Sequence, residues 1–522
     1  MAYRARAITP PLRPWAGIGA AISVAALVFL SFGAVILRAE GWSGLTLVEW
    51  GALRFTLLQA TLSAAFSVIL AVPVARALAR RQFPGRRVLI LLLGAPFILP
   101  VIVAILGLLA VFGRSGWIST ALGLWGLEPI RIYGLHGVVL AHVFFNLPLA
   151  VRLILQGWQD IPAERFRLAA HLDATPYAMW RLLEWPMLQR VLPGVAAVIF
   201  AICLTSFAVA LTLGGGPRAT TLELAIYQAF RFDFDLGRAA LLAVIQVALA
   251  GTAAWVALRL ARHEGFGAGL DRPVQRWDTR SPTLRVQDSI AITCAAAFLL
   301  APLAAIVARG VTNLSGLPAS VWSAAGASLM VACISTGLML IIAVPMAAAL
   351  TSGRRVSVDL AGVLGLAASP LAVGTGLFIL IYPVADPAAL ALPVTAAVNA
   401  IMALPFALRV LVPAARDVVA GHGRLALSLD LRGWTFLRRI FLPRLRPQIG
   451  FAAGLCAALS MGDLGVIALF ADPDRATLPL QIYRLMGAYR MDDAAGAALL
   501  LLCLSLSLFW ICDRGGRANA PA

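Results

Sequence analysis

Long apolar runs alternate with short charged segments along almost the whole chain. Twelve runs come close to the roughly 20 residues that a helix needs to cross a bilayer. They cover about residues 16–37, 54–79, 88–112, 134–155, 191–213, 238–260, 289–309, 323–350, 358–382, 389–412, 447–470 and 494–512. Helices satisfy their own backbone groups in lipid, so the pattern predicts an all-α integral membrane protein. The first run is too long for the core of a signal peptide, and we expect it to be a retained span.

Composition agrees with this class and orients the chain. Charged residues make up 13% of the 522 residues, whereas soluble domains have about 25%. If the loops alternate between the two sides, the side of the amino terminus holds 31 of the 42 basic residues and the other side holds 11. Positive residues favour the cytoplasmic side, so we expect both termini in the cytoplasm. The spread of positive charge over many loops argues against a nucleic-acid partner.

Every basic residue is arginine, and this excludes several chemistries. A chain without lysine has no phosphate-binding loop of the Walker type and no lysine Schiff base. The six cysteines lie in apolar runs without a C-x-x-C pair, and no metal-binding motif is present. We therefore expect no enzyme and no metal or cofactor bound by this chain. Any ATP and Mg²⁺ would belong to a partner subunit.

A polar segment inside this apolar chain occurs twice. The stretch from Arg167 to Pro186 (RLAAHLDATPYAMWRLLEWP) matches that from Arg424 to Pro443 (RLALSLDLRGWTFLRRIFLP) at seven of twenty positions, with an offset of 257 residues. The repeat continues on both sides, and "AVPVARAL" at Ala71 resembles "AVPMAAAL" at Ala343. An even number of spans in each copy makes this a parallel repeat, with both polar segments on one side of the membrane.

The repeat gives the expected domain order. Residues 1–51 form a cytoplasmic tail and the first span, and residues 52–262 form the first permease-like domain with its polar loop at 160–190. Residues 263–322 form a cytoplasmic linker and the seventh span, residues 323–513 form the second domain with its loop at 413–446, and residues 514–522 form the tail.

Helix signals are clear within the first polar loop. Pro162 and Glu164 favour a helix start, Asp173 should end that helix, and Thr175 with Pro176 should begin a second one that Pro186 stops. Met179, Leu182 and Leu183 would then share an apolar face, with Phe436 and Ile440 in the second copy. Arg432 and Gly433 replace the Thr-Pro pair there, so a weaker cap is expected. We expect the two apolar faces to bind a partner.

The repeated segment resembles the E-A-A-x3-G-x9-I-x-L-P loop of type I ABC importer permeases, whose coupling helix inserts into a cytoplasmic ATPase. The residues at motif positions are Arg167, Ala169, Asp173, Leu183, Trp185 and Pro186 in the first copy, and Arg424, Ala426, Asp430, Ile440, Leu442 and Pro443 in the second. Arg167 and Arg424 stand where the family has glutamate, and two aspartates replace its glycine. These departures leave the polar contacts with the ATPase unpredicted. The resemblance implies about 12 spans in two halves of six and two ATPase subunits on the cytoplasmic face.

Wider stretches, such as Leu140–Leu153, Ser206–Ala229 and Gly462–Arg490, resemble the permeases of thiamine ABC transporters. This implies a multi-pass protein of the bacterial inner membrane that takes up thiamine and its phosphate esters, delivered by a periplasmic binding protein. A ferric-iron permease of the same superfamily is the first alternative, and a proton-coupled secondary transporter is the second. The second needs ionisable groups inside the membrane, and Asp463 is the main one. Asp463 is a candidate gate or a helix cap. The sequence does not identify residues that contact substrate.

Overall fold

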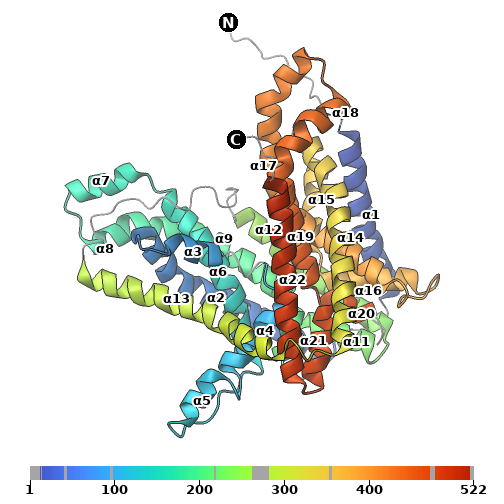
Figure 1. The fold of residues 1–522 in the computed structure, drawn as a ribbon, viewed down its shortest axis with the longest axis horizontal. Coiled ribbons are helices and arrows are strands. Elements are labelled where there is room, and N and C mark those ends of the chain that lie inside the picture. The colour runs from blue at the N-terminus through green and yellow to red at the C-terminus, as the bar shows by residue number, and fades with distance from the viewer. Residues whose placement is uncertain are drawn as a thin grey trace. The chain divides into compact units, whose positions relative to one another are not determined.

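The computed structural model describes residues 12, 14–39, 44–93, 98–216, 219–260, 281–351, 356–470 and 476–517. The described residues form helices and connecting turns without any strand, which confirms the all-α prediction (Figure 1). Within these described ranges, eleven helices are long and apolar enough to cross a membrane, or twelve if one bent pair counts as a single span. Most of the expected linker, residues 261–280, lies outside the described part of the chain. So do parts of the loops at 214–235 and 471–493, which both contain the sequence Arg-Ala-Thr (the R-A-T sequence).

The chain divides into two compact units, and each contains one copy of the polar loop. The first-half unit comprises residues 41–318 and 482–500. Its helices are α2 (Leu47–Arg80), α3 (Arg86–Leu92), α4 (Val101–Phe112), α5 (Trp117–Gly123), α6 (Leu135–Gln159), α7 (Ala163–His171), α8 (Pro176–Met179), a π-helical turn (Trp180–Glu184), α9 (Trp185–Leu204), α10 (Ala208–Leu213), α11 (Leu222–Arg231), α12 (Leu236–Leu260) and α13 (Pro282–Asn313).

The second-half unit comprises residues 1–40, 319–481 and 501–522. It holds α1 (Trp15–Arg38), α14 (Ala319–Leu350), α15 (Val356–Ala367), α16 (Pro370–Ile381), α17 (Ala391–Ser428), α18 (Gly433–Phe436), a second π-helical turn (Leu437–Phe441), α19 (Leu442–Met461) and α20 (Gly465–Phe470). Two further helices, α21 (Leu478–Gly487) and α22 (Met491–Arg517), have residues in both units.

The first helix of each sequence half packs in the unit of the other half. Helix α1 packs against α14, α15 and α16, while α13 packs against α2 and α4. Glycines permit close approach at these contacts: a Cβ at Gly17 would collide with the carbonyl of Pro345, and a Cβ at Gly107 with that of Pro302. The boundaries of the compact units therefore differ from a simple division at the linker, because contacts rather than sequence order define them.

Two of the expected spans have a different form in the structure. The third was expected over residues 88–112, but the long apolar helix there covers Val101–Gly123 and α3 is a separate short helix. The ninth is a pair of helices, α15 and α16, bent by 95°. Ser369 explains the break, since its side chain accepts the amide hydrogen of Ala372 and Pro370 occupies the first turn of the new helix. Hydrophobic length alone did not reveal either break.

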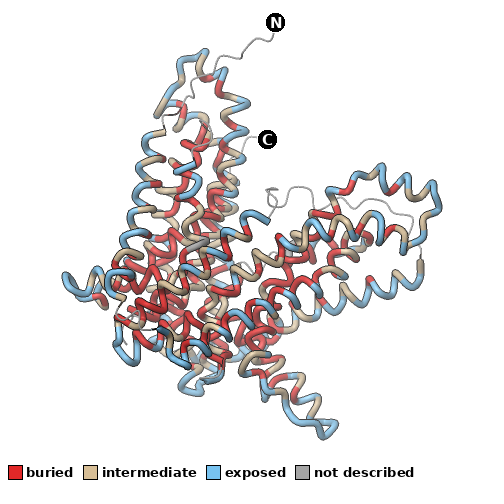
Figure 2. Tube along the Cα trace, turned by 180° about the vertical axis from the view of Figure 1, so that it is seen from behind, coloured by how far each residue is buried: buried red, intermediate tan, exposed pale blue. Residues whose placement is uncertain are grey.

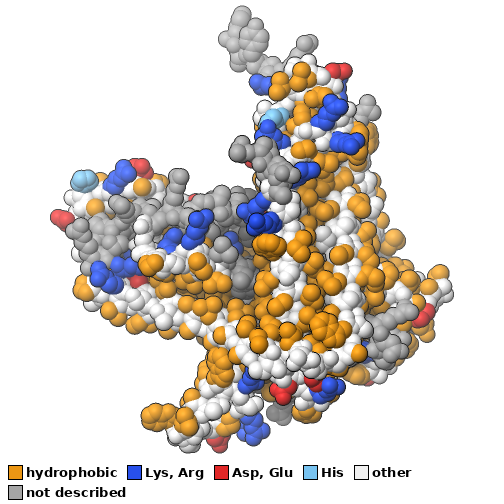
Figure 3. Space-filling view, in the orientation of Figure 1, with side chains coloured by type: hydrophobic (Ala, Val, Ile, Leu, Met, Phe, Trp, Pro, Cys, Tyr) orange, Lys and Arg blue, Asp and Glu red, His pale blue; other side chains and the backbone are white. Residues whose placement is uncertain are grey.

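Polar residues gather where the helices end, as a membrane protein requires. Figure 3 shows mainly hydrophobic side chains along the outer faces of α14 and α22, and basic side chains near the end of α17 and α18. Buried residues concentrate along the middle of the long helices, and the connecting turns are exposed (Figure 2). The two polar loops lie at such helix ends.

Candidate functional site

Both polar loops begin with a helix that ends in the same way. In the first loop α7 follows Pro162, as predicted, and ends at His171. The amide of Ala174 donates to the carbonyl of Ala169 at 3.0 Å, and that of Asp173 donates to Ala170 at 3.2 Å. This pair of hydrogen bonds is a Schellman motif. The first loop therefore contains a sharply terminated helix, and Asp173 ends it as expected.

The second loop repeats this termination at the end of α17. The amide of Leu431 donates to the carbonyl of Ala426 at 2.8 Å, and that of Asp430 donates to Leu427 at 3.2 Å. Helix α17 runs without a break from Ala391 to Ser428, whereas Pro162 separates α6 from α7 in the first half. The two copies thus differ before the helix end and agree at it.

The backbone explains why aspartate can stand where the related loops have glycine. Asp173 has φ +46° and Asp430 has φ +51°, so both are left-handed. Glycine adopts this conformation most easily, and aspartate is one of the few other residues that visit it routinely. The departure from the motif therefore places aspartate, a residue that tolerates the left-handed conformation, at a position where glycine would adopt it most easily.

The second short helix of each loop does not stop at the proline. Thr175 caps α8 as predicted, accepting the amide hydrogen of Ala178 at 3.2 Å, and Arg432 provides no side-chain cap in the second copy. However, α8, the π-helical turn and α9 continue through Pro186, so the predicted stop is wrong. The amide of Trp185 donates to Trp180, five residues back. This wider turn moves aside the carbonyls that a proline ring would meet in a regular α-helix.

The same continuity changes the predicted binding face. Met179 and Phe436 are almost completely buried inside their own units, so the prediction that they contact a partner is wrong. Leu183 and Ile440 are partly buried, and both lie in helices continuous with a candidate span. Leu182, the third residue predicted on this face of the first copy, is 68% exposed, as contact with a partner would require. The error at Met179 and Phe436 arose because a free-standing helix ending at Pro186 would expose the whole face, whereas a helix that continues into the unit buries part of it.

A different set of apolar side chains is exposed in both copies. Tyr177 and Trp434, at matching positions, are 69% and 70% exposed, and Leu172 and Leu429 are 71% and 61% exposed. We call the matched set the exposed apolar pairs; it comprises Leu168 with Leu425, Leu172 with Leu429, and Tyr177 with Trp434. Arg167 and Arg424 are also exposed, beside the first pair. An apolar surface rimmed by charge is typical of an interaction site.

Beneath the first loop, ion pairs of two buried carboxylates connect three helical segments. The Nε atom of Arg76 on α2 lies 2.7 Å from a carboxylate oxygen of Glu184, in the π-helical turn. Arg80 and Arg81 each reach a carboxylate oxygen of Asp288 on α13, also at 2.7 Å. We call these five residues the α2 ion-pair cluster. It was not predicted, because its members are far apart in sequence and look like ordinary loop charges.

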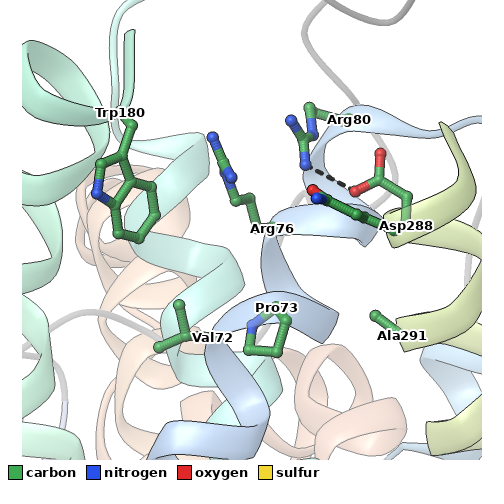
Figure 4. Close-up of a pocket in the computed structure, with 8 residues that line it drawn as sticks. Val72, Pro73, Arg76, Arg80, Trp180, Asp288 and Ala291 are labelled. Carbon is green, nitrogen blue, oxygen red and sulfur yellow. Dashed lines mark hydrogen bonds and ion pairs between the residues drawn. The ribbon is translucent and has the colours of Figure 1, made fainter. Parts of the chain in front are cut away.

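Three residues of the cluster, Arg76, Arg80 and Asp288, line a small cavity of about 160 Å³. In Figure 4 the side chains of Arg76 and Arg80 extend from α2 between Trp180 and Asp288, while Val72 and Pro73 lie on the opposite side of the cavity. The guanidinium group of Arg76 lies 4.7 Å from the centre of the Trp180 ring. Cation–π contact thus adds to the ion pair in joining α2 to the π-helical turn.

At the other end of α2, a hydrogen bond recurs in both units. The amide of Leu222, in the loop with the R-A-T sequence, donates to the Thr56 hydroxyl at 2.9 Å. The amide of Leu478 donates to the Ser328 hydroxyl at 2.8 Å in the second copy. Thr56 and Ser328 occupy matching positions in α2 and α14. Sequence reasoning missed this pair, since a hydroxyl inside an apolar run gives no clear signal.

Asp463 lies between α19 and α20. Its carboxylate accepts the amide hydrogen of Gly465 at 3.2 Å, at the first residue of α20. Nearby, the side-chain amide of Asn399 donates to the Ser460 hydroxyl at 3.0 Å. This geometry is that of a helix cap, and the gate role remains a prediction.

Comparisons with known proteins identify the family of the chain. No protein-family model matches the chain. The thiamine transport system permease protein of Brucella abortus is 38% identical over the whole of this chain and 98% of its own length. That of Escherichia coli K12 is 40% identical over 89% of each chain, and that of Haemophilus influenzae is 34% identical over 87% of each. Similarity of this extent covers both halves and both polar loops, and the chain belongs to the family of thiamine transport system permeases.

Proposed function

We propose that this chain is the membrane-spanning subunit of an ABC importer that carries thiamine and its phosphate esters into the cytoplasm. The observation that carries the proposal is the identity of 38–40% with thiamine transport system permeases over most or all of the chain. Eleven or twelve apolar helices provide the membrane domain that such a subunit needs. The ferric-iron alternative has no comparable support.

The two polar loops would contact two copies of a separate ATPase subunit and would transmit the conformational changes that ATP hydrolysis drives there. Each unit presents one set of exposed apolar side chains around a helix end, and the two sets match position by position. Two identical partners require two similar surfaces, which this repeat supplies. The absence of lysine argues that the chain itself does not hydrolyse ATP.

The arginine distribution supports an inner-membrane location with both termini and both polar loops in the cytoplasm. The loops containing the R-A-T sequence would then face the periplasm, where a substrate-binding protein would deliver thiamine. Cysteine labelling in intact cells tests this orientation. In a variant without the six native cysteines, an impermeant reagent should label cysteine at exposed positions 233 and 489 but not at position 167. Labelling at position 167 alone would reverse the topology.

Transport itself tests the substrate. A bacterial strain lacking its own thiamine permease should regain uptake of labelled thiamine when this chain is expressed with its ATPase and binding protein. Labelled ferric iron, measured in the same cells, serves as the matched comparison. Restored iron uptake without thiamine uptake would refute the proposal and support the ferric-iron alternative.

A further inference from the structure

The buried ion pair beneath the first loop has no equivalent in the second. The repeat places Phe441 where the first copy has Glu184, and Ala348 where it has Arg76. Phe441 is fully buried, and its ring centre lies 6.4 Å from that of Phe436. At this position the first loop therefore makes an ion pair, whereas the second loop makes an apolar contact.

We infer that Glu184 is a positioning residue whose ion pair with Arg76 makes α2 follow movements of the first polar loop. This inference rests on the proposed function. Glu184 has no exposed surface, and besides Arg76 it accepts a hydrogen bond from the indole nitrogen of Trp158 at 3.4 Å. Separating a buried carboxylate from its cation leaves an uncompensated charge, so loop and helix move together.

Helix α2 is suited to carry that movement across the unit. It is continuous from Leu47 to Arg80, and the 20 residues between Thr56 and Arg76 correspond to roughly 30 Å of helix. Thr56 binds the amide of Leu222 near the far end, and Glu49 pairs there with Arg238. One continuous helix thus connects the polar loop to the loop with the R-A-T sequence.

Two local features favour movement near the carboxyl-terminal end of α2. Pro73 lies one turn before Arg76 and lacks an amide hydrogen, so the helix has one backbone hydrogen bond fewer at that point. The cavity beside it is lined by Pro73, Arg76 and Trp180, which leaves space next to the ion pair (Figure 4). Asp288 on α13 forms ion pairs with Arg80 and Arg81 on α2, so we expect α13 to move together with α2.

The test compares thiamine transported per ATP hydrolysed in proteoliposomes containing the chain, its ATPase subunits and its binding protein. Two variants separate coupling from folding. Glu184→Gln keeps the acceptor for Trp158 but removes the charge, and the double variant Arg76→Met with Glu184→Gln also removes the unpaired cation. Glu164→Gln, an exposed carboxylate of the same loop, and Phe441→Leu, at the matching position of the second loop, are the controls.

We expect both Glu184 variants to assemble with the ATPase and hydrolyse ATP, while transport per ATP falls about tenfold, a typical size for coupling between sites. Both controls should keep the ratio of the unaltered chain. A normal ratio in both variants would overturn the inference. So would recovery in the double variant alone, or its failure to assemble, since either result indicates a structural role. Failure of the proposed function would appear differently, as an unaltered chain that transports no thiamine.

Discussion

The exposed apolar pairs allow a quantitative test of the proposed docking surface for an ATPase subunit. Replacing Leu172 or Leu429 by serine removes an apolar side chain that is 71% or 61% exposed in the free chain. Burying a whole leucine side chain contributes about 1.5–3 kcal/mol. The exposed two-thirds is therefore worth about 1–2 kcal/mol, which corresponds to a roughly 5- to 30-fold weaker complex for each substitution.

The assay is a titration of the detergent-solubilised chain with the ATPase, together with thiamine uptake in cells. Folding should hardly change, because surface substitutions usually alter stability by less than about 0.5 kcal/mol. Leu124→Ser is the matched control, since Leu124 is 84% exposed and lies outside both polar loops. If the Leu172 and Leu429 variants bind the ATPase as tightly as this control does, the exposed apolar pairs are not the docking surface.

Three further predictions concern the left-handed aspartates, the Thr56 hydrogen bond and ATP hydrolysis. Asp173→Gly and Asp430→Gly should keep full uptake. Asp173→Val and Asp430→Val should lower the free energy of unfolding by about 1–2 kcal/mol, because the backbone φ at these positions is positive and valine disfavours it. Thermal unfolding in detergent compares the glycine with the valine variants, and equal stability would contradict the left-handed assignment. Thr56→Val should cost about 1–3 kcal/mol by leaving the buried amide of Leu222 without an acceptor, while Thr56→Ser should retain stability; hydrogen exchange at Leu222 would report the loss, and unchanged protection in the valine variant would argue against the bond. The purified chain alone should show only background ATP hydrolysis, and activity that survives removal of every other subunit would disprove the need for a separate ATPase.

The sequence predicted those parts of the loop that depend on single residues and their neighbours. Pro162, Asp173 and Thr175 each act through their own backbone or through an amide three residues away, so local rules located the helix start, the break and the cap. The motif glycine could also be aligned with the aspartate of each loop. The reason why aspartate fits at this position, its left-handed backbone, became clear only from the φ angles.

The parts that were missed depend on tertiary context. Proline usually ends a helix, and only the π-helical turn before Pro186 shows that this one does not. That single error reversed the exposure expected for Met179. Likewise, Arg76 and Glu184 are 108 residues apart, and each alone resembles a charge that faces water. Sequence patterns describe one element at a time, and the ion pair exists only where two elements meet.

The distribution of similarity between the two loops bears on what they contact. Their common features are the Schellman termination, the left-handed aspartate and the exposed apolar pairs, all of which define an outer surface. Their differences lie underneath, where Glu184 faces α2 and the matching Phe441 is buried beside Phe436. Two copies of one ATPase would require similar outer surfaces but place no such demand on the buried sides, which pack against different helices. The pattern therefore favours two identical partners on the outside together with unequal transmission inside, and it makes the first loop the more sensitive of the two to loss of a buried charge.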